Sequence, residues 1–348
     1  MQLNKQEAIR QMNEMGSKCE PFFFIIDFET KQTLLIPQPF QNKTPYSFKI
    51  NELRNYNIVN QPLEKDIILK KKPISFTQYQ RAFDYCMKEM NYGNSYLLNL
   101  TFPTPIELNL TLEEVFYYSQ AKYKLLVPDH FVCFSPETFV QIKDGLISSN
   151  PMKGTISAKI PNAAQHILAD KKEMSEHHTI VDFIRNDLNM IAKRIRVKDF
   201  RYIDRIITNK DDLLQVSSHI EGILPNDYQN HIGDILFRLL PAGSISGAPK
   251  RKTLEIIKAA EGYDRGFYTG IFGYFDGKNL DSGVSIRFIE QGNGLIFKSG
   301  GGITTQSSAK AEYQEMIDKV YVPIRNIPIV EKSAIADVSN DIFFNLNS

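Results

Sequence analysis

The chain has 348 residues, of which 42% are hydrophobic and 23% are charged, a composition typical of a folded enzyme with a substantial core. Its 41 Lys and Arg against 40 Asp and Glu leave a net charge of +1, which excludes bulk electrostatic attraction to nucleic acid or anionic lipid. Three cysteines match neither a zinc motif nor a disulfide framework, which favours a reducing, cytoplasmic compartment.

The first seventy residues predict strands and loops. The N-terminus has no apolar signal core, and no stretch approaches the roughly 18 apolar residues that a spanning helix needs, so we expect neither export nor a membrane span. Phe22 to Ile26 and Thr33 to Ile36 are apolar runs around a polar turn, which is typical of a hairpin. Residues 51–72 are polar and irregular and predict a connection.

A helix is expected from about Ser75 to Asn91, with Ser75 or Thr77 as its cap. Four apolar runs after it predict strands, and the turn residues Asp144-Gly145 join the last two in a hairpin. These runs are Tyr96 to Thr101, Phe131 to Phe134, Thr138 to Ile142 and Leu146 to Ser149.

Glu137 enters this hairpin, and Lys153, in Pro151-Met152-Lys153-Gly154-Thr155, leaves it, so the two are expected to lie close together. A lysine attacks as the free amine, and a carboxylic acid beside it can protonate a leaving hydroxyl. The pair is therefore a candidate nucleophile and proton donor. Taken alone it indicates little, because lysines mostly lie on solvated loops and a Lys-Gly step is usually a turn.

Two later segments predict helices of similar pattern. They run from about Ala169 to Arg194 and from about Ala309 to Val322, and each has apolar residues spaced three and four apart along one face. Each also carries two glutamates three residues apart, which are neighbours on a helix. A solvated acidic face is the ordinary interpretation. The pairs are Glu173 with Glu176 and Glu312 with Glu315.

Between these helices, Leu240 to Lys250 is a loop of small residues that leads into a helix expected to end at Glu261. Such a loop can present backbone N–H groups to an anion, although it is not a Walker loop. Two hairpins follow, and Gly300-Gly301-Gly302 ends the second. The glycines indicate either a bend or close approach of a ligand. The expected strands are Tyr268 to Phe275, Ser282 to Glu290 and Leu295 to Ser299.

The order of elements, with antiparallel turns dominating, favours an α/β or α+β architecture over a doubly wound parallel sheet. Several motifs, in order, resemble those of the chorismate-utilising enzymes over about Ser75 to Ile327. The resemblance implies two large antiparallel sheets packed face to face and flanked by helices. The motifs are Ser135-Pro136-Glu137, Pro151 to Thr155, Lys172 to His177, Ile180 to Leu188, Pro241 to Lys250, Ser285-Ile286-Arg287, Gly300 to Ile303 and Glu312 to Glu315.

Within that family, the enzymes that add water to the ring carry a lysine base where this chain has Leu97, which disfavours isochorismate and salicylate synthesis. Anthranilate synthases have a small residue where Lys153 stands, and a lysine there is the mark of aminodeoxychorismate synthase component I, a transferase. By this resemblance Lys153 adds to the ring as the hydroxyl leaves. Ammonia then displaces the lysine to form 4-amino-4-deoxychorismate, and Glu137 donates the proton.

The resemblance also implies the binding residues. Chorismate is a dicarboxylate, and Mg²⁺ held by carboxylates can neutralise its ring carboxylate. Glu176 and Glu315 are implied as direct ligands, with Glu173 and Glu312 nearby or bridged by water. The substrate-binding positions are implied to be Tyr268, Arg287, Gly301, Gly302, Ile303, Ser246 and Thr155.

No glutaminase motif occurs, so the resemblance implies a separate glutamine amidotransferase subunit as the source of ammonia. Gln215 stands where the family often has a histidine, and residues 156–159 depart from the usual pattern. The N-terminal part is short, so inhibition by tryptophan is not expected. We expect one catalytic domain over 1–327, with a shortened strand region over 1–72, and a tail over 328–348. Two rivals stay open: anthranilate synthase component I, and a non-catalytic phosphate- or nucleotide-binding module.

Overall fold

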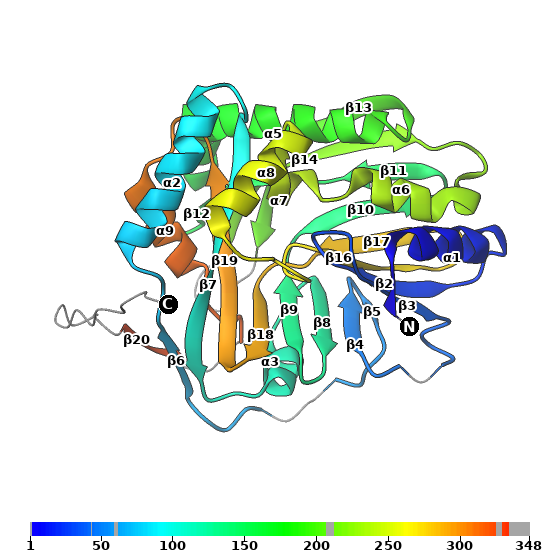
Figure 1. The fold of residues 1–348 in the computed structure, drawn as a ribbon, viewed down its shortest axis with the longest axis horizontal. Helices are drawn as coiled ribbons and strands as arrows, with labels where there is room; N and C mark the ends of the chain where they lie inside the picture. Colours follow the sequence, from blue (N-terminus) through cyan, green and yellow to red (C-terminus); the bar gives the residue numbers. More distant parts are fainter. Residues whose placement is uncertain (1, 43, 59–61, 207–211, 325–328, 334–348) are drawn as a thin grey trace, which may run out of the picture.

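Two large β-sheets dominate the fold (Figure 1). The computed structural model describes residues 2–42, 44–58, 62–206, 212–324 and 329–333, and each sheet contains ten strands from these residues. Along the first sheet the strands are β1 (Gln2–Leu3), β3 (Thr33–Pro37), β2 (Phe22–Ile26), β16 (Ile271–Phe275), β17 (Leu280–Val284), β10 (Thr138–Lys143), β11 (Leu146–Ser149), β14 (Leu213–Ile223) and β12 (Met152–Ser157), with β13 (Lys193–Ile206) also paired to β14.

The second sheet is antiparallel except at one edge, where β20 runs parallel to β6. Its strands in order are β20 (Ile329–Ser333), β6 (Ile67–Lys71), β7 (Leu97–Leu108), β19 (Gly294–Ile303), β18 (Phe288–Gly292), β9 (Phe131–Ser135), β8 (Tyr123–Val127), β4 (Ser47–Ile50) and β5 (Leu53–Arg54), with β15 (Gly247–Ala248) paired to β7. The helices are α1 (Lys5–Ser17), α2 (Phe76–Asn91), α3 (Leu112–Tyr118), α4 (Ala163–Ala169), α5 (Lys171–Asn189), α6 (Ile232–Leu239), α7 (Gly243–Ser246), α8 (Lys250–Glu261) and α9 (Ala309–Asp318), with the 3₁₀ helix η1 (Tyr228–His231).

The sheets pack against each other through a shared apolar core. Phe23 and Phe272 of the first sheet belong to one buried cluster with Phe48, Tyr123 and Phe288 of the second. The rings of Phe23 and Phe48 stack with centroids 4.0 Å apart. Large aromatic side chains bury much area per residue, which favours this face-to-face arrangement. The predicted architecture of two large antiparallel sheets is confirmed.

Helices cover the remaining sheet faces. Side chains of α1, α5 and α6 share a core with the first sheet, whereas α2, α8 and α9 pack on β7 and β19 of the second. Figure 1 shows α5 along the top of the molecule, α6 and α1 near each other at the right, and α2 and α9 at the left. No helix in the described part of the chain is both long and apolar enough to span a bilayer.

Several predicted elements are confirmed. Strands β2 and β3 form the expected hairpin, and α2 begins after Ser75, whose side chain accepts from the backbone of Gln78 in a capping box. Helix α8 ends at Glu261 as predicted, and the following Gly262 adopts φ +68°, a left-handed conformation that glycine reaches without a Cβ clash. Helices α5 and α9 are shorter than predicted and end at Asn189 and Asp318.

Two predictions for the N-terminal region are wrong. Residues 5–17 form a helix rather than strands and loops, and its capping box of Asn4 and Glu7 was a readable sequence signal. Residues 67–71 form β6 rather than a connection. Ile67 and Leu69 are buried while Ile68 is exposed, which is the alternation of a strand with one covered face.

The predicted strand from Ser282 to Glu290 is also wrong, because it divides into β17 and β18. β17 lies in the first sheet and β18 in the second, so the chain crosses between the sheets at residues 285–287. Arg287 at the end of this crossing has φ +53°. The predicted tail also contributes structure, since Ile329–Ser333 forms β20, while residues 328 and 334–348 lie outside the described part.

Lys124 on β8 yields a prediction about stability. Its side chain is buried, its Nζ donates to the carbonyl of Ser119 at 2.8 Å, and it lies over the ring of Phe116. Burial lowers the pKa of Lys124 to about 7. Between that value and the unfolded pKa of about 10.4, the unfolded chain binds the proton more tightly, so stability should rise with pH across this window.

Lys124→Met should therefore raise the free energy of unfolding near pH 7 by roughly 2 kcal/mol and flatten its rise toward alkaline pH. Urea unfolding at both ends of the window measures the effect, with Lys143→Met, at an exposed lysine, as the control. If Lys124→Met were less stable than the wild type and its stability had the same pH dependence, burial of Lys124 would not destabilise the folded state.

Candidate active site

Lys153 lies near the start of β12, which pairs with β14 at the end of the first sheet. Its Nζ lies 3.7 Å from Oε2 of Glu176 on α5. A Cβ placed on Gly302 would lie 2.9 Å from the same Nζ, so the amine rests over bare backbone of β19 in the second sheet. The side chain therefore reaches from one sheet toward the other.

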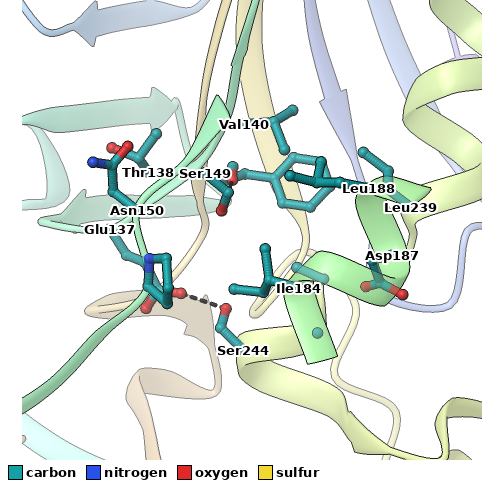
Figure 2. Close-up of a pocket in the computed structure, with 14 residues that line it drawn as sticks. Glu137, Thr138, Val140, Ser149, Asn150, Ile184, Asp187, Leu188, Leu239 and Ser244 are labelled. Atoms are coloured by element: carbon teal, nitrogen blue, oxygen red, sulfur yellow. Dashed lines mark hydrogen bonds between the residues drawn. The ribbon is translucent and has the colours of Figure 1, made fainter. Parts of the chain in front are cut away.

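Glu137 lies between β9 and β10, at the start of the predicted hairpin. Its carboxyl group accepts a hydrogen bond from the hydroxyl of Ser244 (Figure 2). Burial raises the pKa of Glu137, against the lowering effects of Ser244 and of the charges on Lys153, Arg287 and Lys319. A raised pKa keeps more of the carboxyl protonated at neutral pH, as a proton donor requires.

A small cavity lies beside Glu137, between the start of β10, the end of β11, α5 and α7 (Figure 2). Its wall is largely apolar, with Ile184 and Leu188 of α5 and Leu239 of α6. Asp187 also lines it, and its Oδ2 accepts from Nζ of Lys250 at 2.9 Å. Burial raises the pKa of Asp187 although Lys250 opposes the rise.

The loop of small residues folds as α7 beneath α5. A Cβ on Gly243 would lie 2.4 Å from Cε1 of Phe183, so only glycine allows this approach. Ser246 is fully buried, and its hydroxyl donates to the carbonyl of Ala242 at 2.9 Å. The loop thus packs against helix α5 rather than presenting an open row of backbone N–H groups.

The three glycines continue β19 along β7 instead of bending it. A Cβ on Gly300 would lie 2.1 Å from the carbonyl oxygen of Leu100, and one on Gly301 would lie 3.3 Å from Oε2 of Glu312 and 3.4 Å from Oε1 of Glu315. The bare strand therefore has the Lys153 amine beside Gly302 and two glutamates of α9 beside Gly301.

Gly302→Ala is predicted to fold normally but to displace the Lys153 amine, because its Cβ is too close to the end of that flexible side chain and makes an ordinary contact, at 3.5 Å, with Cδ1 of Leu97. Turnover should fall by about tenfold or more, since a misplacement of the reacting group by about 1 Å is costly. Gly300→Ala is the contrasting variant, because its Cβ meets backbone and should lower the melting temperature. Steady-state rates and thermal unfolding of both variants check this. Equal effects of the two on stability would contradict it.

The four glutamates approach the site from α5 and α9. Glu312 is buried, Glu315 pairs with Nζ of Lys319 at 2.6 Å, and Glu173 lies beside Gly154 of β12. Within the described residues, no set of three or more His, Cys, Asp or Glu side chains is arranged to hold a metal ion. Mg²⁺ takes few protein carboxylates and keeps several waters, so the oxygen donors facing Gly301 fit such an ion. The metal site stays a prediction.

Arg287 and Tyr268 lie near the crossing between the sheets. Nε of Arg287 donates to the hydroxyl of Tyr321 at 3.3 Å. Tyr268 is buried, and burial raises its pKa. The positive charge of Arg287 opposes the rise in the pKa of both Tyr268 and Glu137.

The remaining predicted positions differ in exposure. Ile303 is fully buried in the core between β19 and the helices α2, α8 and α9. Thr155 is exposed and pairs in register with Gln215 of β14. The side-chain oxygen of Gln215 is buried without a hydrogen-bond partner among the described residues, so a polar group of a ligand could satisfy it.

The sequence did not single out Ser244, Lys319 or the pair of Asp187 with Lys250. Lys319 follows Glu315 by four residues, a spacing at which oppositely charged side chains of a helix meet, so the pairing was readable. Burial lowers the pKa of Lys319. The contact of Ser244 with Glu137 joins residues 107 apart and had no local signal.

A family model described as chorismate binding enzyme matches residues 4–325. The chain belongs to the chorismate-binding enzyme family. Members of this family are enzymes, and the match includes every predicted site residue from Glu137 to Glu315.

Relatives in this family have several names. The chain is 52% identical over 324 residues to an uncharacterized PabA-like protein of Haemophilus influenzae, covering 93% of this chain and 98% of the relative. It is 33% identical over 277 residues to aminodeoxychorismate synthase component 1 of Bacillus subtilis, covering 75% of this chain and 57% of that protein. It is also 33% identical over 213 residues to anthranilate synthase component 1 of Pseudomonas aeruginosa, covering 59% of this chain and 42% of that protein.

Among solved structures, the menaquinone-specific isochorismate synthase of Escherichia coli superposes with a TM-score of 0.68 at 17% identity, covering 90% of this chain and 80% of that one. At that identity the likeness shows the fold alone. The structure therefore has the fold of a chorismate-utilising enzyme, and identity to the relatives does not separate the reactions.

Proposed function

We propose that the protein is aminodeoxychorismate synthase component I, which replaces the ring hydroxyl of chorismate with an amino group. The observation that carries the proposal is the Lys153 amine on bare backbone between the sheets, with Glu137 at a cavity that extends to Pro151, two residues before Lys153. An amine that reaches the substrate side of the cleft can act as a nucleophile. A small residue at this position, as anthranilate synthases have, could not.

The proposed reaction has two displacements. The free amine of Lys153 forms a C–N bond to the ring while the hydroxyl leaves as water, with the proton donated by Glu137. Ammonia then attacks the ring and displaces the lysine amine, which gives 4-amino-4-deoxychorismate. Chorismate and ammonia are consumed and water is released, so atoms balance without an oxidant or reductant.

The surrounding cations suit an anionic substrate. The positive charges of Arg287 and Lys319 both act to lower the pKa of Glu137. A dicarboxylate would be attracted to these two side chains. Glu176 and Glu315, with Glu173 and Glu312 nearby, would hold Mg²⁺, which when bound neutralises the ring carboxylate. Gly301 and Gly302 offer backbone that a substrate can approach closely.

A separate glutamine amidotransferase subunit is proposed as the source of ammonia. The relatives from Bacillus subtilis and Pseudomonas aeruginosa are both named component 1, which supports the presence of a second component. We place the reaction in 4-aminobenzoate and folate biosynthesis, in the cytoplasm. Purified protein that used glutamine alone as well as ammonia would contradict a separate subunit.

Product analysis tests the function against its rivals. Protein incubated with chorismate, Mg²⁺ and ammonium salt is expected to form aminodeoxychorismate without releasing pyruvate. Anthranilate with an equal amount of pyruvate would instead establish anthranilate synthase component I. Protection by nucleotides against heat, with no turnover of chorismate, would favour a binding module, but the covered Gly243 loop gives that module little support.

A further inference from the structure

Ser244 is placed against Glu137 by a firmly packed turn. Its hydroxyl donates to Oε1 of Glu137, as the dashed line in Figure 2 shows. The preceding residue, Gly243, is held against Phe183 of α5, and the carbonyl of Ala242 accepts from the hydroxyl of Ser246. The position of the Ser244 hydroxyl is therefore set by the packing of α7 under α5.

This contact makes the two carboxyl oxygens of Glu137 unequal. Oε1 can accept from Ser244 in the ionised acid, and as a carbonyl oxygen it can still accept in the neutral acid. Among the residues that the structure describes, Oε2 of Glu137 has no hydrogen-bond partner. A proton on the neutral acid is consequently favoured on Oε2.

We propose that Ser244 is a positioning residue for Glu137, because it holds Oε1 and leaves Oε2 as the oxygen that carries the proton to be donated. The inference rests on the proposed function, since it takes Glu137 as the acid of that reaction. Within the part of the chain that the structure describes, Ser244 forms no side-chain hydrogen bond with Lys153 or with Gly300-Gly301-Gly302, so it acts through Glu137 alone.

The groups around Glu137 determine whether its pKa should rise or fall when the Ser244 hydroxyl is removed. Lys153 of β12, Arg287 after β17 and Lys319 after α9 all favour the ionised form, as does the Ser244 hydroxyl, while burial favours the neutral form and prevails. Asp187 of α5 lines the same cavity. Removing the hydroxyl takes away one group that stabilises the carboxylate, so the pKa of Glu137 should rise further.

Infrared difference titration of the substrate-free protein can follow the protonated carboxyl band that Glu137→Gln removes. Ser244→Ala is expected to raise the midpoint of this band by about one pH unit, because a hydrogen bond to a charged group is lost. Ser244→Thr keeps a hydroxyl and should restore the midpoint. Ser149→Ala is the matched control, since Ser149 lines the same cavity but donates to the carbonyl of Phe139.

In turnover with ammonia, Ser244→Ala should lower kcat by about tenfold with little change in KM, and Ser244→Thr should recover it. An unchanged midpoint in Ser244→Ala, or an equal shift in Ser149→Ala, overturns the inference. Ser244→Cys, whose thiol is a weak donor, replaces the alanine variant if that one does not fold. The titration needs no substrate, so failure of the wild type to aminate chorismate would count against the proposed function separately.

Discussion

Replacing Lys153 with alanine is expected to lower kcat for the amination of chorismate by at least about 10³-fold, because the reaction loses its nucleophile. The fold should remain, since the Lys153 side chain is partly exposed and reaches across the cleft rather than into a core. The rate is measured by chromatography of aminodeoxychorismate formed from chorismate, Mg²⁺ and ammonia. Circular dichroism and the melting temperature check that the variant is folded.

Two further variants test whether Lys153 acts as a nucleophile or only as a positive charge. Lys153→Arg keeps a cation near Glu176, but a guanidinium does not lose its proton and should be equally inactive. Lys159→Ala removes an exposed lysine of the same segment and should retain full activity. If Lys153→Arg were nearly as active as the wild type, Lys153 would act only as a positive charge.

Mass spectrometry gives direct evidence of the covalent step. Wild-type protein incubated with chorismate and Mg²⁺ without ammonia should gain the mass of chorismate less one water on the peptide that contains Lys153. The adduct should be absent from Lys153→Ala and should disappear from the wild type when ammonia is added. Full turnover by the alanine variant would rule out covalent catalysis by this lysine.

Glu137→Gln is expected to lower kcat by about 10²–10⁴-fold, the usual contribution of a positioned proton donor. Glutamine keeps the size of the side chain and can still accept from Ser244, so the loss is specific to the proton. The same chromatographic assay measures it, with the exposed Glu107→Gln as the control. A fall of less than about threefold would assign the donor role to another group.

Glu137→Gln should not lower stability although it lowers activity. Burial raises the pKa of Glu137 above its unfolded value, so as pH rises the unfolded chain loses this proton first and the folded state becomes less favoured. Glu137→Gln removes that effect and should leave stability at neutral pH equal to or above that of the wild type. Urea unfolding at acid and neutral pH tests this, and a variant destabilised mainly at neutral pH would contradict the raised pKa.

Local sequence signals were sufficient for many elements. The hairpin of β2 and β3, the capped start of α2 and the glycine end of α8 follow from apolar alternation, a capping residue and a glycine, each of which acts within a few residues. The missed α1 had such a signal in its capping box. The crossing at residues 285–287 had none, because both β17 and β18 are apolar strands and only their partners show that they lie in different sheets.

The sequence by itself determined the family, the lysine on which the proposed reaction rests, and the acidic pairs on two helices. Only the tertiary structure decided how these meet: the Lys153 amine over Gly302, the α9 glutamates beside Gly301, and Ser244 on the carboxyl of Glu137. The reason is physical. Motif chemistry is carried by residue type and short spacing, whereas a contact between distant segments depends on how two sheets and their helices pack.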